Sequence, residues 1–100
     1  MGIPYPKTDV IKSDVETATA LVRTGAAHLY GINLTAGADA ASATLHNSVD
    51  NSGDILASVK AAINTTTYVP FPNPVNASTG LYLVITGTTP VCNVYFTAAS

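Results

Sequence analysis

Apolar side chains alternate with hydroxyl or amide side chains from residue 15 to residue 97, and this period of two is the strongest constraint on the fold. Successive side chains of a β-strand point to opposite faces of a sheet, so a strand buried on one face shows this period. The clearest example is GLYLVITG, residues 80–87, in which Leu81, Leu83 and Ile85 alternate with Tyr82, Val84 and Thr86. The chain is therefore predicted to consist of strands with one face turned toward a core.

Four further segments show this pattern, with Gly, Pro and Asn between them. They are residues 15–24, 28–37, 42–47 and 90–97, and the residues expected on their inner faces include Tyr30, Ile32, Leu34, Ala43, Leu45, Cys92, Val94 and Phe96. Short strands at intervals of about 10 to 15 residues with turn signals between them are typical of a β-sandwich or barrel. We interpret the chain as an all-β protein, an antiparallel β-sandwich forming one domain over residues 15–100.

The segment DILASVKAAIN, residues 54–64, fits two structures. Alternation of Ile55, Ala57 and Val59 suits a strand, whereas Leu56 and Val59, with Asp54 as an N-cap, suit a helix. Periodicity alone does not decide between them in so short an apolar run. A strand is favoured because a single helix would leave the neighbouring strands short of pairing partners.

Prolines mark two segments that differ from the rest. VPFPNPVN, residues 69–76, has prolines at every second position, and a residue without an N–H donor fits an edge strand or an extended connection but not a central strand. Phe71 either packs under the sheet, which is the usual position of a large aromatic residue, or contacts a partner. Residues 1–14 contain Pro4 and Pro6 and have weak periodicity, so they are predicted to form an extended N-terminal arm. Such an arm is either ordered by a partner or a frayed end.

The stretch SVDNSGD, residues 48–54, has features of a calcium loop and of a tight turn. With Gly53 at the sixth position of an EF-hand loop, Ser48, Asp50 and Ser52 take the first, third and fifth positions, but Val59 stands where the bidentate Glu is required. Asn, Asp, Ser and Gly are also the residues that favour turns. The turn interpretation explains more of the residues, and a hairpin or short loop is predicted here.

The sequence contains few signals for metal binding or catalysis. His28, His46 and Cys92 lie at no zinc-binding spacing, and no nucleophile elbow or glycine-rich phosphate loop occurs. Most carboxylates fall in the arm or in turns, where they keep ordinary pKa values. The chain is predicted to be no enzyme and to hold no metal or cofactor.

The charge pattern excludes further classes of partner. Charged residues are 10% of the chain and the formal net charge is -2, so there is no electrostatic case for binding nucleic acid or an anionic membrane. No run reaches the roughly 18 apolar residues that span a bilayer. A single cysteine cannot form an internal disulfide, which is consistent with folding in a reducing cytosol.

The aromatic residues leave one binding interpretation open. Tyr82 and Tyr95, with Asn93 close in sequence, could form an aromatic and amide face for a sugar or a single strand if their segments pair. Cross-strand packing of amphipathic rings is the simpler alternative.

Two runs carry a resemblance to a known group of proteins. LYGINLTAGADAASATLHNSVDNSGDILASVKA and FPNPVNASTGLYLVITGTTPVCNVYF, which together extend from Leu29 to Phe96, resemble small all-β virion proteins of tailed bacteriophages, of the capsid decoration or cement type. The similarity lies in an aromatic-Gly strand, a Thr-Ala-Gly turn, an Asn-Ser-Gly hairpin tip, a Phe-Pro piece and a Val-Tyr-Phe end. It implies a jelly-roll-like sandwich and provides no catalytic residues.

The resemblance also implies a function and partners. The protein is expected on the capsid exterior of a virion assembled in the host cytoplasm, where it would bridge major capsid subunits and associate with itself as a trimer or dimer. The residues expected to contact the capsid are Ile3, Tyr5 and Val10 in the arm and Phe71 in the proline-rich edge. The alternatives are a carbohydrate- or receptor-binding virion module that uses Tyr82, Asn93 and Tyr95, and a head–tail connector or tail subunit.

Overall fold

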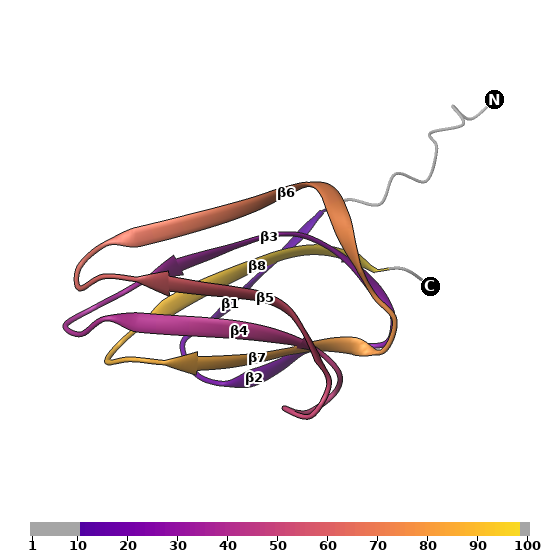
Figure 1. Cartoon of the computed structure of the whole chain (residues 1–100), viewed down its shortest axis with the longest axis horizontal. Helices are drawn as coiled ribbons and strands as arrows, with labels where there is room; N and C mark the ends of the chain where they lie inside the picture. The colour runs from indigo at the N-terminus through magenta and orange to yellow at the C-terminus, as the bar shows by residue number, and fades with distance from the viewer. Residues whose placement is uncertain (1–10, 99–100) are drawn as a thin grey trace.

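Strands make up almost all of the regular structure in this computed structural model, which describes residues 11–98 (Figure 1). Over that range no helix is long and apolar enough to cross a membrane. The strands are β1 (Lys12–Glu16), β2 (Ala20–Thr24), β3 (Ala27–Thr35), β4 (Ala41–Asn47), β5 (Asp54–Ala61), β6 (Thr66–Ala77), β7 (Gly80–Thr86) and β8 (Val91–Ala98).

The strands form two four-stranded antiparallel sheets packed as a sandwich. Sheet A has the order β1-β8-β3-β6, and sheet B has the order β2-β7-β4-β5. Strand β1 therefore pairs with β8, β2 with β7, β3 with β6 and β4 with β5, as if one long hairpin were folded about the β4–β5 loop and wrapped into two layers. This is the strand order of a jelly roll, and the predicted fold class is confirmed. Figure 1 shows the β4–β5 loop at one end and the β3–β4, β5–β6 and β7–β8 connections at the other.

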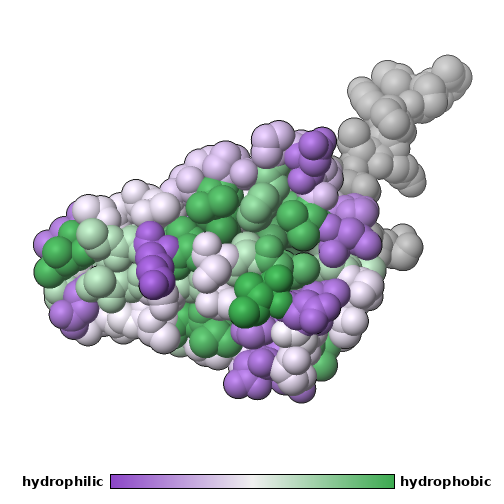
Figure 2. Space-filling view, in the orientation of Figure 1, coloured by the Kyte–Doolittle hydropathy of each residue, from purple (hydrophilic) through white to green (hydrophobic). Residues whose placement is uncertain are grey.

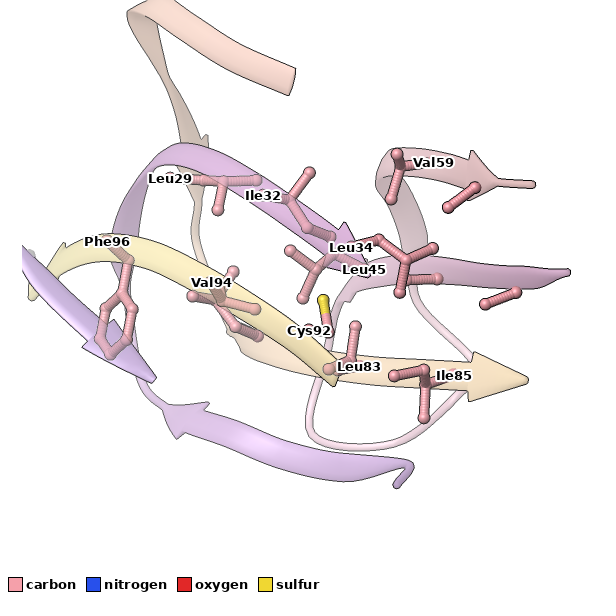
Figure 3. Packing of buried hydrophobic residues seen from close by; sticks show 14 of the residues in the cluster. Leu29, Ile32, Leu34, Leu45, Val59, Leu83, Ile85, Cys92, Val94 and Phe96 are labelled. Carbon is pink, nitrogen blue, oxygen red and sulfur yellow. The ribbon is translucent and has the colours of Figure 1, made fainter. Parts of the chain in front are cut away.

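The alternation in the sequence becomes the core between the sheets. Leu34 and Val94 of sheet A and Leu45 and Leu83 of sheet B have no exposed surface, and Figure 3 shows their side chains filling the space between the layers. Leu45 and Leu83 lie directly opposite each other on adjacent strands. The inward positions predicted for residues 42–47, 80–87 and 90–97 are confirmed.

The prediction for strand β3 is wrong at Tyr30. Leu29 and Ile32 are fully buried, whereas Tyr30 is only partly buried. The register shifts between Leu29 and Gly31 in the ladders to both β6 and β8, so Tyr30 is the extra residue of a β-bulge. A bulge inverts the alternation beyond it, and a strict period of two therefore assigned Tyr30 to the wrong face.

The segment that fitted both helix and strand is strand β5, as favoured from the sequence. Its alternation is also interrupted, because the register with β4 shifts between Leu45 and His46. As a result Val59 and Ala61 are buried, but Ile55 is 64% exposed.

The predicted boundary between arm and domain lies too late in the sequence. Strand β1 begins at Lys12 and pairs with β8 along its whole length, so residues 12–14 belong to the sandwich and not to an arm. The predicted strand at 15–24 is in fact parts of β1 and β2, which lie in different sheets and are separated by residues 17–19. The remainder of the predicted arm, residues 1–10, lies outside the described residues.

The proline-rich segment is part of β6, which forms an edge of sheet A as predicted. Pro70 lies opposite Gly31, and residues 71–74 have no partner in the β3 ladder before pairing resumes at Val75. Proline removes the N–H donor that a second neighbour would need, so an edge is where it can be accommodated.

Candidate functional site

The structure tests one of the four residues expected to contact a capsid. Phe71 is partly buried and packs against the core cluster, which is the first of the two positions considered for it. Ile3, Tyr5 and Val10 lie outside the described residues.

The grouping of Tyr82, Asn93 and Tyr95 on one face is wrong. Tyr82 is on β7 in sheet B, and Asn93 and Tyr95 are on β8 in sheet A. Tyr82 alternates with the buried residues Leu81 and Leu83, so its side chain lies on the outer face of sheet B. The two tyrosines therefore point away from each other on opposite sides of the sandwich.

A different tyrosine joins Tyr95 on the outer face of sheet A. The ring centroids of Tyr68, on β6, and Tyr95 are 6.1 Å apart, with the planes at 87°. Gly31 of β3 lies between them, opposite Tyr95 in one ladder and opposite Pro70 in the other. A Cβ atom at Gly31 would be 3.4 Å from the ring and hydroxyl of Tyr68, so the missing side chain lets Tyr68 lie across the middle strand.

Two amides continue this surface. Asn33 of β3 is opposite Tyr68 on one side and opposite Asn93 on the other, so all three lie in one row across the sheet. The Oδ1 atom of Asn33 is covered and has no hydrogen-bond partner. We call Gly31, Asn33, Tyr68, Asn93 and Tyr95 the tyrosine platform.

Strand β1, at the other edge of sheet A, has its polarity reversed. Asp14 and Glu16 lie opposite Val94 and Cys92, whose side chains are in the core, so the two carboxyl groups point to the inner side of the sandwich. Val15 lies on the outer face and is 55% exposed. A strand in a free sandwich normally places apolar residues inside and carboxylates outside.

The carboxyl pair affects the local pKa values. A hydrogen bond with Asp14 raises the pKa of Glu16 to about 7, and burial and the Asp14 charge act in the same direction. Burial raises the pKa of the Cys92 thiol to about 12, with a further contribution from both carboxylates. Cys92 is thus a buried apolar residue, as its alternation with Val94 indicated.

The outer face of sheet B carries a second set of exposed apolar side chains. Leu21 and Ile55, which are 44% and 64% exposed, lie on the two edge strands at the ends of one row across the sheet, and the residues between them, Tyr82 and His46, are partly buried. On the side of the molecule that Figure 2 shows, where strands of both sheets are in view (Figure 1), hydrophobic side chains gather over the middle, with pale and hydrophilic residues around them.

The SVDNSGD stretch is a turn, as predicted: it forms the loop of the β4–β5 hairpin. Asp50 Oδ1 accepts hydrogen bonds from Ser48 Oγ at 2.9 Å, from Ser52 N at 2.9 Å and from Ser52 Oγ. These bonds, first from Ser52 and then from Ser48, lower the pKa of Asp50. The oxygens that suggested a calcium loop therefore bind the hydrogen-bond donors of the turn itself.

Comparison with known proteins found no family model that matches the chain and no curated protein that matches its sequence. Between residues 11 and 98 the structure has no detectable pocket and no group of three or more potential metal-ligating residues. The candidate surfaces are therefore the tyrosine platform, the outer side of β1 and the apolar row of sheet B.

Sequence reasoning missed Tyr68, Asn33 and Val15. Tyr68 and Asn33 become neighbours only because β6 pairs with β3, and these strands are about 30 residues apart in the chain. The signal for Val15 was present, since it lies between the acidic residues Asp14 and Glu16. It was not used because residues 15–24 were taken as one strand.

Proposed function

We propose that this protein is a structural virion protein that decorates a bacteriophage capsid and stabilises it by bridging major capsid subunits. The jelly roll supports this, since the fold is common among viral capsid domains, although a fold alone never establishes a function. The low charge supports it too, because surfaces with few charges associate readily. The proposal includes no catalytic step, metal or cofactor.

The observation that carries the proposal is the reversed polarity of β1. Val15 on its outer face is 55% exposed, and Ile11, which directly precedes the strand, is 51% exposed. Covering two such half-exposed side chains contributes about 1 kcal/mol each. A strand that turns Asp14 and Glu16 inward and Val15 outward is arranged for a partner on its outer side.

The segment before β1 extends this contact in the proposal. Residues 1–10 lead into Ile11, and they contain Ile3, Tyr5 and Val10, the apolar residues predicted to contact the capsid. Together with Ile11 and Val15 they would give a continuous apolar contact from the first residues to the edge of the sandwich. We define Ile11 and Val15 as the β1 margin.

The contact is made by side chains rather than by adding a strand to the free edge of β1. Inward-facing charges on an edge strand oppose pairing with a further strand, which would bury them. Asp14 and Glu16 are in that position, and Asp14 Oδ2 already lacks a hydrogen-bond partner.

Weak individual contacts are sufficient for a cement protein. A protein that binds the assembled lattice but not its separated subunits stabilises the lattice by mass action, whatever the strength of one contact. Self-association as a trimer or dimer would add avidity by linking several arms. On this proposal the protein is on the capsid exterior and joins a particle assembled in the host cytoplasm.

The experiment is co-sedimentation with empty capsids assembled from the major capsid protein of the phage whose capsid, on this proposal, the chain decorates. The full chain is expected to sediment with the capsids and to raise their melting temperature. The double variant Ile11→Ser/Val15→Ser should bind at least tenfold more weakly. The control Ile55→Ser removes a more exposed apolar side chain, from sheet B, and should bind like the original protein.

Two results would overturn the proposal. One is that the full chain does not sediment with the capsids under any salt condition. The other is that Ile11→Ser/Val15→Ser binds as well as the original, which would overturn the assignment of the contact to β1; a loss in Ile55→Ser would then place it on sheet B. Deleting residues 1–10, which leaves β1 complete, tests the arm separately.

A further inference from the structure

We propose that the tyrosine platform binds an uncharged oligosaccharide. This goes beyond capsid binding, because it assigns a second ligand to the outer face of sheet A. The platform is centred on β3, and it adjoins the β1 margin where Asn93 lies directly opposite Val15. Five residues carry the inference: Gly31, Asn33, Tyr68, Asn93 and Tyr95.

The two rings form a corner that suits a sugar ring. Tyr68 and Tyr95 meet at 87°, and Tyr68 is 56% exposed, so a large part of one aromatic ring is open to solvent beside a second ring. The face of an aromatic ring is electron-rich, and it attracts the weakly positive C–H groups on the flat side of a pyranose. Tyrosine also keeps a hydroxyl group that can bond to sugar hydroxyls.

Gly31 provides the space for this arrangement. A Cβ atom there would be 3.2 Å from the Val69 carbonyl oxygen, which is tight, and 3.4 Å from two atoms of Tyr68, which is van der Waals contact, so a side chain longer than that of alanine would meet the ring. Glycine within a strand commonly marks a place where another group approaches the backbone closely. Here that group is the Tyr68 ring, held over the middle strand of the sheet.

The amides supply hydrogen bonds beside the rings. Asn33 and Asn93 lie directly opposite each other, next to Tyr68, and an amide can both donate to and accept from a hydroxyl group. Asn33 Oδ1 is covered and unpaired, which costs about 1–3 kcal/mol. A sugar hydroxyl that reached this acceptor would satisfy it.

The absence of charge around the platform selects the class of ligand. The outward positions of β3, β6 and β8 around it hold Thr, Asn, Pro, Val and Tyr, with His28 on the other side of the bulge, and none of those that the ladders place beside it is Asp, Glu, Lys or Arg. The acidic residues of the neighbouring β1 point inward. A nucleic acid or a sulfated or sialylated glycan would require cationic groups, whereas a neutral oligosaccharide does not.

The test is an NMR titration of the isotope-labelled full chain with four neutral sugars: maltohexaose, cellohexaose, mannohexaose and galactotetraose. At least one sugar is expected to shift the backbone amide signals of Gly31, Asn33 and Asn93 at millimolar concentration or below. Tyr68→Ala should raise the Kd at least tenfold, and Tyr68→Phe, which keeps the ring, should raise it less than threefold. Tyr82→Ala, on the opposite face, should leave the Kd unchanged.

Several outcomes would refute the inference. They are no shift with any of the four sugars, shifts confined to sheet B, or equal affinity of Tyr68→Ala and the original protein when the spectrum shows that the variant is folded. Tighter binding of a heparin-derived oligosaccharide than of every neutral sugar would also contradict it. Co-sedimentation of Tyr68→Ala with capsids tests capsid binding without the platform ring, and sugar titration of Ile11→Ser/Val15→Ser tests sugar binding without the β1 margin. A failure of the sugar inference can therefore be told apart from a failure of the proposed function.

Discussion

Replacement of Leu83 by alanine tests the packing of the two sheets. Leu83 has no exposed surface and lies opposite Leu45 in the middle of sheet B, with sheet A above it. The change removes three carbon atoms, worth about 0.8 kcal/mol each, or about 2.4 kcal/mol in transfer free energy. The hydrogen-bonded strands on either side of β7 hold their positions, so the cavity left by Leu83 cannot close completely. The free-energy cost of this cavity brings the expected loss of unfolding free energy to about 3–4 kcal/mol.

The matched control is Leu21→Ala, the same change on the outer face of the same sheet. Leu21 is 44% exposed, so only a little more than half of the transfer term is lost and no cavity forms, which predicts about 1 kcal/mol. Both variants are measured by urea unfolding followed by tyrosine fluorescence and far-ultraviolet circular dichroism. The two should have the same m-value, because the surface exposed on unfolding hardly changes. Equal losses in the two variants, or a larger loss in Leu21→Ala, would refute the assignment of inner and outer faces.

Three further predictions concern titration, the thiol and the hairpin loop. The pKa of Glu16 is raised from 4.5 to about 7 in the folded protein, so the folded state holds a proton that the unfolded state releases, and stability should fall as the pH rises from about 4.5 through 7. Glu16→Gln should flatten this part of the pH profile. The change in unfolding free energy that it removes is about 1 kcal/mol or less, because the Glu16 carboxyl group is only partly buried. An unchanged profile would contradict the pairing with Asp14. Cys92 is buried and its pKa is raised to about 12, so a thiol reagent should label it far more slowly in the native protein than in urea, and equal rates would show that it is accessible. Gly53→Ala should lower the unfolding free energy by about 1–3 kcal/mol, because a Cβ atom would lie 2.3 Å from the Asn47 carbonyl oxygen. The control Asn51→Ala, at the exposed tip of the same loop, should change it by less than about 0.5 kcal/mol in the same urea assay.

The sequence predicted the strands where the local pattern alone decides the structure. In residues 80–87 and 90–97 every apolar residue predicted to face inward is buried, because no extra residue interrupts the alternation within these two strands. Tyr30 was assigned to the wrong face because the bulge after Leu29 depends on pairing with β6 and β8. Pairing between distant strands leaves no local signal in the sequence.

The candidate sites also depend on pairing between distant strands, which the sequence does not reveal. The split of Tyr82 from Tyr95 follows from the order of strands in each sheet, since β7 and β8 are consecutive in the chain but belong to different layers. The period of two establishes which side of its own strand a residue occupies, but not which sheet the strand joins. The residues that do meet, Tyr68 and Tyr95, come from the two strands on either side of β3.

The reversed polarity of β1 is the feature on which the proposed function most depends. The sequence contains its signal, but only the register with β8 establishes which side chains face inward. The sequence alone placed Asp14 in the arm and Glu16 in a strand over residues 15–24. Their pairing with Val94 and Cys92 places them on the inner side and leaves Val15 outside. An exposed apolar residue on its own needs no explanation, but one that has exchanged faces with two carboxylates points to a partner.

Electron cryomicroscopy of the empty capsids saturated with this protein tests the proposed attachment most directly. We expect one sandwich-shaped density at each binding position on the capsid exterior, with Ile11, Val15 and the preceding ten residues against neighbouring capsid subunits and with β6, the other edge of sheet A, directed away from the shell. Capsids without added density, or density that contacts the shell through the row of Leu21 and Ile55 on sheet B, would contradict this assignment.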